Sequence, residues 1–383
     1  MITLEQYKLL CEAEVRQAIA ENISRNPFDV ALDKRIAHAA EVATQVKYLD
    51  RARKKLPSYF EARCIIPSLA FEQSSSEECA AHKPLSGGSV LDLTCGLGVD
   101  AFYLSRKFER VVTIERNEVL AEVARENFNR LGAKNIEVVC AESAEYVAAC
   151  EEHFDWCYAD PDRRGVKGEK LVRLEDCSPD MVALMPRLRS IASRVCIKAS
   201  PMFDVDEAMR LFGACSVEVA SLGDECKEVL IYIGGEGENT ITATALGIGS
   251  YAVDLGSCEE LSVPQFRAAE YRWLVQPDVA LQKCRLARRH LAGKADIWSE
   301  NGYGFAVERP SDVIGRIYEI DRIEPFDPKA LKREMKGRRV QVFKRDFPLA
   351  TERLLAMTGI KEGGSEKVAF TTIGGEYLVI RLK

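Results

Sequence analysis

The sequence predicts an α/β protein whose centre is a seven-stranded, doubly wound (Rossmann-like) domain, flanked by an N-terminal helical region and a C-terminal α+β domain of ferredoxin-like order. Three observations predict this fold. Apolar residues recur at helical spacing early in the chain, strand-like and helical segments alternate from Ser89, and the order strand, helix, strand, helix, strand, strand begins near Tyr318. The expected domains are 1–80, 81–236 and 237–383.

The central domain is predicted from strands that each lead into a helical pattern. Such alternation is typical of a parallel sheet with crossover helices. The last two strands have only a short turn between them and predict an antiparallel hairpin that ends the sheet. Beyond it we expect a β-prone stretch at 240–247 and helical segments within 264–291. The expected strands are 89–93, 111–115, 136–143, 154–161, 194–200, 216–224 and 228–234.

Composition and charge are those of an ordinary folded protein. Of 383 residues, 47% are apolar and 29% charged, so a long disordered tail is not expected. No apolar run is long enough for a membrane span and the N-terminus lacks a signal-peptide layout, so we expect a cytoplasmic location. Because the net charge is −6, RNA would have to meet a local basic patch. The run from Lys332 to Arg345 is a candidate, although such a run is as commonly a solvated face.

The cysteine and histidine content argues against disulfides and metal sites. The 13 cysteines are odd in number, spread along the chain and never spaced as CxxC. We therefore expect reduced cysteines that serve as small apolar core residues. The 4 histidines are scattered, so no metal is predicted.

The strongest motif follows the first predicted strand, where Gly96 and Gly98 occur before a helical segment. Glycines at this point let the backbone turn sharply and approach a ligand, whose polar parts meet the unpaired N–H groups of the helix. The stretch from Gly96 to Ala101 also satisfies the dinucleotide fingerprint, so a nicotinamide or flavin enzyme has to be considered. The motif alone leaves both cofactor classes open.

Acidic residues at strand ends separate these two classes. Asp92 lies inside the first strand, where dinucleotide folds usually keep apolar residues, and its carboxylate can reach the ammonium end of a methionine. Asp160 and Pro161 end the fourth strand, at the sheet edge where reacting groups gather. A dehydrogenase has no need of this pair, whereas a methyltransferase can use it to orient a nucleophile; Asp-Pro is also a common turn. Glu115, which ends the second strand, could bind the ribose of either cofactor.

Four motifs connect the chain with a known family: 69–77 (LAFEQSSSE), 92–100 (DLTCGLGVD), 160–164 (DPDRR) and 198–204 (KASPMFD). With them, the chain from Phe71 to about Gly234 resembles the class I S-adenosylmethionine-dependent methyltransferases. The whole chain resembles the bacterial subgroup with a C-terminal THUMP-like domain. The resemblance implies S-adenosyl-L-methionine as the cofactor. It also implies methylation of tRNA or rRNA, because THUMP and THUMP-like domains accompany enzymes that modify these RNAs.

Site roles follow as hypotheses. Asp160, with the Pro161 carbonyl, is expected to orient the nucleophile beside the cofactor and to accept its proton. Arg163 and Lys198 are expected on the substrate side, with a structural salt bridge as the alternative for each. The remaining expectations are that Asp92, Thr94, Gly96 and Gly98 hold the methionine part, Glu115 the ribose and Glu142 the adenine amine, that Gln73 and Ser75 close over the cofactor, and that Arg338 and Arg339 bind RNA.

The sequence leaves the methyl acceptor open. Enzymes that methylate exocyclic base amines typically have proline and an aromatic where this chain has Asp162 and Arg163. Methylation at pyrimidine C5 would need a nucleophilic cysteine, and none follows Asp160-Pro161. A small-molecule or protein methyltransferase, or a cofactor-binding RNA adaptor without catalysis, remain alternatives.

Overall fold

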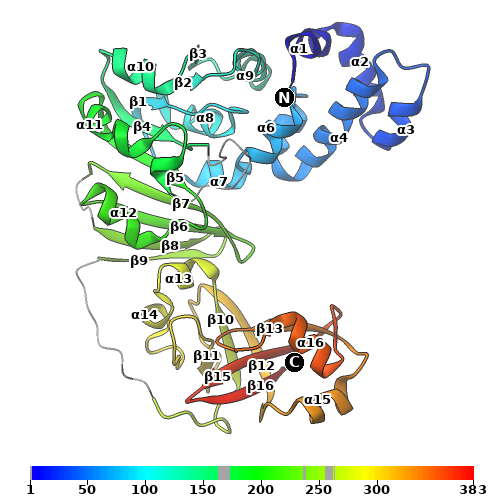
Figure 1. The fold of residues 1–383 in the computed structure, drawn as a ribbon, viewed down its shortest axis with the longest axis vertical. Coiled ribbons are helices and arrows are strands. Elements are labelled where there is room, and N and C mark those ends of the chain that lie inside the picture. The colour runs from blue at the N-terminus through cyan, green and yellow to red at the C-terminus, as the bar shows by residue number, and fades with distance from the viewer. Residues whose placement is uncertain (1, 163–172, 236–238, 255–261, 263) are drawn as a thin grey trace. The chain divides into compact units, whose positions relative to one another are not determined.

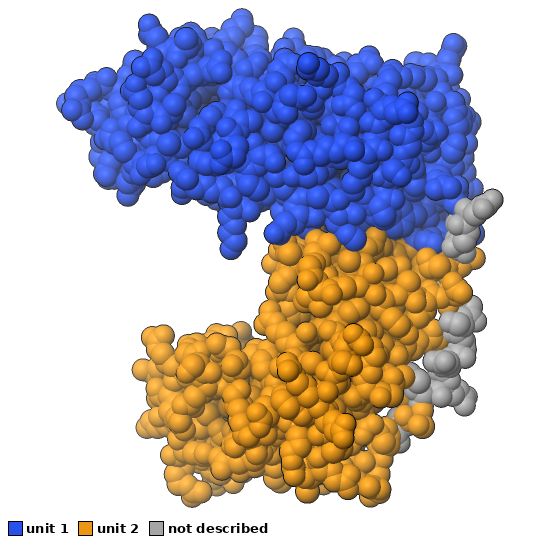
Figure 2. Space-filling view, turned by 180° about the vertical axis from the view of Figure 1, so that it is seen from behind, with its two compact units in different colours: residues 1–216, 228–238 blue, residues 217–227, 239–383 orange. Residues whose placement is uncertain are grey.

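A computed structural model describes residues 2–162, 173–235, 239–254, 262 and 264–383. The chain forms two compact units, which Figure 2 shows in different colours. The first unit contains 1–216 and 228–238, and the second contains 217–227 and 239–383. Arg163 and Arg164 of the predicted motif lie outside the described residues.

The first unit begins with a group of helices, drawn in blue in Figure 1. Local sequence explains where they start: Thr3 forms a capping box with Gln6, and the Ser76 hydroxyl accepts a hydrogen bond from the Cys79 N–H. These helices are α1 (Leu4–Cys11), α2 (Ala13–Asn22), α3 (Pro27–Leu32), α4 (Ala39–Lys55), α5 (Pro57–Glu61), α6 (Ser68–Gln73) and α7 (Glu77–His82).

The helical region shares one core with the sheet that follows. Tyr59 is fully buried in this core and donates to the Leu97 carbonyl at 3.2 Å. The Asn127 side chain accepts from the Ile65 N–H at 2.8 Å and donates to the Ile65 carbonyl at 2.9 Å. Because buried polar groups need partners, these bonds fix the segment before the sheet against the glycine loop around Gly96 and Gly98 and against the helix that contains Asn127.

The sheet of the first unit has the order β3-β2-β1-β4-β5-β7. Its strands are parallel except β7, which runs antiparallel to β5. The predicted doubly wound fold is therefore confirmed. The expected end of the sheet is not, because β6 (Ser216–Leu222), predicted as part of the terminal hairpin, pairs onward with β8 (Thr240–Ala245). Its elements are β1 (Gly87–Asp92), α8 (Val99–Leu104), β2 (Phe108–Glu115), α9 (Glu118–Leu131), β3 (Ile136–Cys140), α10 (Ser143–Ala149), β4 (Phe154–Ala159), the 3-10 helix η1 (Leu174–Asp176), α11 (Met181–Ile191), β5 (Ala192–Ala199), α12 (Val205–Phe212) and β7 (Glu225–Ile233).

The second unit contains β6 (Ser216–Leu222), β8 (Thr240–Ala245) and β9 (Gly249–Asp254), with β8 parallel to β6 and antiparallel to β9. Its other sheet has the order β11-β10-β12-β16-β15-β13-β14. The predicted order of strand, helix, strand, helix and two strands is confirmed from β12 onward, with the short β14 as an addition. This order differs from the β-α-β-β-α-β order of a ferredoxin-like domain, so the ferredoxin-like description is wrong. The elements are β10 (Trp273–Pro277), α13 (Val279–Lys283), α14 (Ala287–Leu291), β11 (Gly304–Ala306), β12 (Gly315–Pro325), α15 (Pro328–Met335), β13 (Arg339–Lys344), α16 (Thr351–Thr358), β14 (Lys361–Glu362), β15 (Glu366–Ile373) and β16 (Glu376–Leu382).

The helical segments expected within 264–291 are partly wrong. Among the described residues of this stretch only α13 and α14 form, and the apolar stretch from Trp273 is the strand β10. Leu274 and Val275 are fully buried because β10 pairs with both β11 and β12. A short buried strand and a buried helical segment have similar apolar patterns, so tertiary pairing decides between them.

Candidate functional site

The loop between β1 and α8 has the backbone geometry that a ligand requires. Gly96 has φ +56° and Gly98 has φ +85°, values that side chains rarely tolerate. A Cβ atom at Gly96 would meet no atom of the described residues within 4 Å, whereas one at Gly98 would lie 2.5 Å from the Phe128 ring. Gly98 therefore serves close packing of the loop on α9, and Gly96 leaves open space above the loop.

Asp92 lies beneath this loop and is fully buried. Its two oxygens accept hydrogen bonds from the Thr94 N–H at 3.0 Å and from the Thr113 hydroxyl at 2.6 Å. Burial raises the pKa of Asp92 to about 7, and the bonds from the two threonines only partly oppose this rise. The carboxyl group consequently changes charge near neutral pH.

Glu115 connects the end of β2 with the glycine loop. Its side chain accepts from the Gly96 N–H at 2.9 Å and from the Asn117 N–H at 2.8 Å. Burial raises its pKa, while these backbone donors lower it. Glu142 is exposed at the N-cap of α10, and Gln73 is exposed at the end of α6.

Thr94 connects the glycine loop with the end of β4. Its hydroxyl accepts from the Asp160 N–H at 2.7 Å, and its own N–H donates to Asp92. Pro161 is buried directly after Asp160. Because β1 and β4 are neighbouring parallel strands, the predicted residues Asp92, Thr94 and Asp160 meet at one sheet edge.

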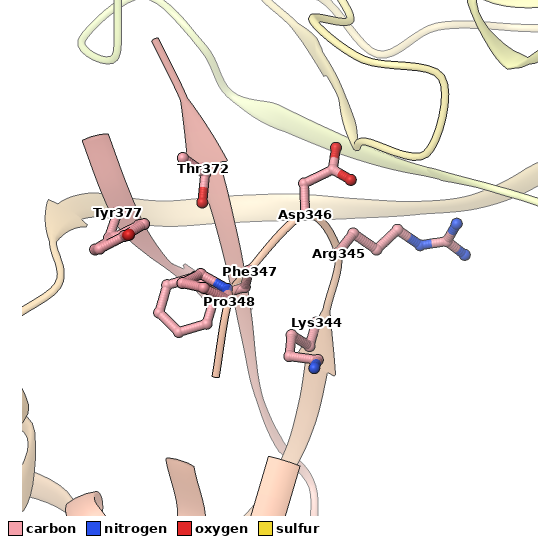
Figure 3. A pocket seen from close by; sticks show the side chains of 7 residues that line it. All are labelled: Lys344, Arg345, Asp346, Phe347, Pro348, Thr372 and Tyr377. Carbon is pink, nitrogen blue, oxygen red and sulfur yellow. The ribbon is translucent and has the colours of Figure 1, made fainter. Parts of the chain in front are cut away.

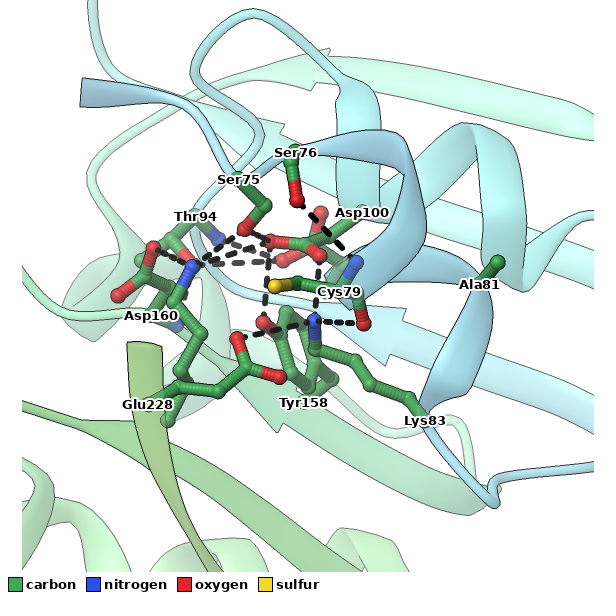
Figure 4. Close-up of polar contacts among 12 residues, drawn as sticks. Ser75, Ser76, Cys79, Ala81, Lys83, Thr94, Asp100, Tyr158, Asp160 and Glu228 are labelled. Carbon is green, nitrogen blue, oxygen red and sulfur yellow. Dashed lines mark hydrogen bonds and ion pairs between the residues drawn. The ribbon is translucent and has the colours of Figure 1, made fainter. Parts of the chain in front are cut away.

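Lys198, at the end of β5, contacts three side chains of this site, Ser75, Asp100 and Asp160, which are labelled in Figure 4. Its ammonium group lies 2.5 Å from Asp160 Oδ2, 2.6 Å from Ser75 Oγ and 3.4 Å from Asp100 Oδ2. The side chain is only 6% exposed. Burial opposes the charge, but Asp100 and Asp160 outweigh it and raise the pKa of Lys198. Lys198 is therefore a buried ammonium that binds the predicted catalytic carboxylate.

A second buried lysine extends this cluster. Lys83 is fully buried and lies 2.7 Å from Asp100 Oδ1 and 3.5 Å from Glu228 Oε2. The Tyr158 hydroxyl donates to Asp100 Oδ2 at 3.1 Å. Burial raises the pKa of Asp100, yet the two lysines outweigh this effect and hold it below its usual value. Burial also raises the pKa of Glu228, whose Oε1 has no hydrogen-bond partner among the described residues.

Sequence reasoning missed Lys83, Asp100, Tyr158 and Glu228. Asp100 offered a signal, because it stands in the first turn of α8 directly after the glycine loop. Lys83 and Glu228 offered none, since they are 145 residues apart and only the β7 register brings them together. We call Lys83, Asp100, Asp160, Lys198 and Glu228 the buried charge network.

The predicted RNA-binding arginines lie on the second unit. Arg338 and Arg339 are exposed, and Arg338 is paired with Glu366 at 2.6 Å. Arg345, from the same basic run, is instead half-buried: its guanidinium contacts the Pro277 carbonyl, and burial lowers its pKa. An open pocket of about 470 Å³ adjoins it (Figure 3), lined by Lys344, Arg345, Asp346, Phe347, Pro348, Thr372 and Tyr377.

Three kinds of feature are absent from the described part of the chain. Among those residues there is no group of three or more His, Cys, Asp or Glu side chains arranged to hold a metal. The described cysteines form no disulfides, and most of them are buried. No helix in this part of the chain has the length and apolar character needed to span a membrane.

Known families match the two regions that carry these features. A methyltransferase domain matches residues 90–162, and a THUMP domain-like family matches residues 315–383. A crystal structure of a proposed methyltransferase from Porphyromonas gingivalis W83 superposes with a TM-score of 0.82 and 25% identity, covering 100% of this chain and 98% of that one. The methyltransferase match lies within the predicted central domain, and the THUMP domain-like match lies within the predicted C-terminal region.

Curated relatives match shorter spans. Ribosomal RNA small subunit methyltransferase J of Coxiella burnetii is 32% identical over 127 residues, which are 29% of this chain and 49% of that protein. An uncharacterized S-adenosylmethionine-dependent methyltransferase of Mycobacterium tuberculosis is 26% identical over 231 residues, 58% of this chain and 59% of that protein. The chain therefore spans about half the length of the first of these relatives.

Proposed function

We propose that this chain is an S-adenosylmethionine-dependent methyltransferase that methylates a base in tRNA or rRNA. The observation that carries the proposal is the junction of Asp92, Thr94 and Asp160. Through Thr94, the loop that would hold the cofactor is hydrogen-bonded to the residue whose carboxylate would orient the acceptor. The relatives that modify ribosomal RNA and the THUMP-like domain support RNA as the substrate.

The residues fit S-adenosylmethionine. Gly96 leaves open space above the loop, and Glu115 lies beside it with a carboxylate for the ribose hydroxyls. Asp92, when ionised, supplies the negative charge that the ammonium end of the cofactor requires, and exposed Glu142 would meet the adenine amine. When bound, the cofactor supplies a sulfonium-activated methyl group. Gln73 and Ser75 would cover it from the segment before β1.

Asp160 is the proposed catalytic residue. Its side chain is 20% exposed at the end of β4, so it can contact both cofactor and acceptor. Together with the Pro161 carbonyl, it would accept hydrogen bonds from the nucleophile and hold it in line with the methyl group. Positioning of this kind can supply most of the acceleration in a displacement reaction. Arg163 stays a substrate-side candidate on the sequence alone.

Incubation with labelled S-adenosylmethionine and total RNA from cells lacking the protein tests this function. Label in one modified nucleoside, lost with Asp160→Ala while cofactor binding persists, is the expected result. Cofactor binding with no label in RNA would favour a small-molecule or protein methyltransferase, or a non-catalytic RNA adaptor. Calorimetry that detects NAD but not S-adenosylmethionine would overturn the proposal.

A further inference from the structure

Lys198 has all its hydrogen-bonding capacity directed into the protein. An ammonium group has three donors and no acceptor. In Lys198 these donors face Asp160, Ser75 and Asp100, and the side chain is 6% exposed. Lys198 thus has no donor left for an RNA phosphate, and its role has to be sought in what it does to Asp160.

Lys83 and Lys198 contact different oxygens of Asp100. Asp100 receives the Lys83 ammonium at 2.7 Å on one oxygen, and the Ser75 and Tyr158 hydroxyls on the other. Because Asp100 is already well supplied with donors, its contact with Lys198 is long, at 3.4 Å. Lys198 makes its short contact, 2.5 Å, with Asp160. Lys198 therefore has its shorter contact with Asp160, while Lys83 binds Asp100; Figure 4 labels Lys83, Asp100 and Asp160.

Fixing Asp160 matters because its carboxylate lies at the rim of the network. A free aspartate at a strand end can rotate about two side-chain bonds and present either oxygen to the acceptor. Charge-assisted hydrogen bonds are short and directional, and a buried pair is screened little by solvent. Because Lys198 binds Oδ2 of Asp160, this oxygen faces the protein interior, and Oδ1 is left to bind the methyl acceptor.

We propose that Lys198 is a positioning residue for methyl transfer: it fixes the Asp160 carboxylate in one orientation, and Lys83 keeps it available for that task. This inference rests on the proposed function. It assigns Lys198 neither a contact with RNA nor one with the cofactor. A misplacement of about 1 Å in a transfer site can cost about 100-fold in rate, which sets the size of the expected effect.

Lys198→Met in the full chain tests the proposal. Single-turnover transfer to total RNA, with the protein and the RNA in excess over labelled S-adenosylmethionine, should slow by about 100-fold. The calorimetric Kd for the cofactor should stay within about threefold, because Lys198 does not contact it. Lys198→Arg should recover to within about tenfold of wild type, because a guanidinium can also bind a carboxylate. Lys198→Gln, which keeps a donor but no charge, should resemble Lys198→Met and serves if that variant does not fold.

Lys107→Met is the matched control. Lys107 is partly buried in the same unit, but its ammonium group binds the backbone carbonyls of Ala81 and Lys83 rather than a carboxylate of the buried charge network. Removing it should lower stability without slowing transfer.

Three results would overturn the proposal. The first is a wild-type transfer rate in Lys198→Met. The second is weaker RNA binding with an unchanged rate at saturating RNA, which would mark Lys198 as a substrate contact. The third is loss of cofactor binding and thermal stability together, with no recovery in Lys198→Arg, as a merely structural lysine would give. If the wild-type chain itself transfers no methyl group, the proposed function fails first, and this inference falls with it.

Discussion

The two units use their charged residues in opposite ways. In the first unit, Lys83, Lys198 and Glu228 are buried and pair with the largely buried Asp100 and Asp160, so their contacts set side-chain positions around Asp160. In the second unit, Arg338 and Arg339 are exposed on the surface, where a pair such as Arg338 with Glu366 contributes little. A buried charge must be paired, and so it fixes the position of the side chain that pairs with it. An exposed charge contributes mainly to the electrostatic potential of the surface. Single substitutions should therefore have large effects on activity in the first unit and small effects on RNA binding in the second.

The largest effect is expected at Asp160. Asp160→Ala should reduce methyl transfer by about 10²–10⁴-fold, the range typical of losing a general base or an orienting group. Calorimetry should find the affinity for S-adenosylmethionine changed by no more than about threefold. Asp155→Ala is a suitable control, since Asp155 follows the start of β4 and caps the Gly88 and Ser89 N–H groups at its far end. Equal activity in Asp160→Ala and wild type would remove Asp160 from the chemistry.

The next largest effect is a difference in stability between alanine substitutions at the two glycines of the loop between β1 and α8. Gly98→Ala should cost about 2–4 kcal/mol of unfolding free energy, because it combines a positive φ with a Cβ atom 2.5 Å from Phe128. Gly96→Ala should cost only about 1–2 kcal/mol, since no atom of the described residues lies within 4 Å of its added atom. Gly96→Ala should weaken cofactor binding instead. Denaturant melts and calorimetry on both variants measure this; equal stability losses would contradict the distinction.

Asp92 should make cofactor binding depend on pH. Because burial raises its pKa to about 7, the carboxyl is largely protonated at pH 6 and ionised at pH 8. Only the ionised form can pair with the ammonium of the cofactor, so affinity should rise about tenfold over this interval. Asp92→Asn should bind weakly at both values, which also corrects for titration of the cofactor itself. A wild-type Kd that follows the variant's at every pH would exclude Asp92 from the ammonium site.

The same carboxyl should affect folding with the opposite sign. Its native pKa lies above the ordinary value of 3.8, so between these values the folded chain holds a proton that the unfolded chain has lost. Stability then falls as pH rises through this window, and Asp92→Asn should flatten this part of the profile.

The sequence predicts the parts of this molecule that local pattern encodes. Gly96, Glu115 and Asp160 follow from strand ends and turns, and the structure places all three around one loop. The buried partners do not follow, because the contact of Lys83 with Glu228 depends on segments 145 residues apart. The local pattern also predicts a helical region where strand β10 forms, because β10 is defined by pairing with β11 and β12, which lie later in the chain.

The smallest effect is expected on the second unit. If Arg338 and Arg339 bind RNA phosphates, changing both to Gln should weaken binding only severalfold at moderate salt, with little dependence on sequence. The slope of log affinity against log salt should become shallower by about 0.7–0.9 for each phosphate that the variant no longer neutralises. Filter binding or fluorescence anisotropy at several salt concentrations measures this slope.

A matched control tests whether RNA binding depends on where the positive charges lie or only on how many the chain carries. Lys8 and Arg16 are exposed on the N-terminal helices, and changing both to Gln gives the same change of net charge. That variant should keep the wild-type slope, because phosphate binding is local while the long-range field is screened within about 10 Å at 0.1 M salt. Glu366→Gln adds a test in the other direction: it releases Arg338 from its ion pair and should tighten RNA binding slightly. Equal slopes for both double variants would mean that RNA responds to the net charge of the chain and that the basic run of the second unit is an ordinary solvated surface.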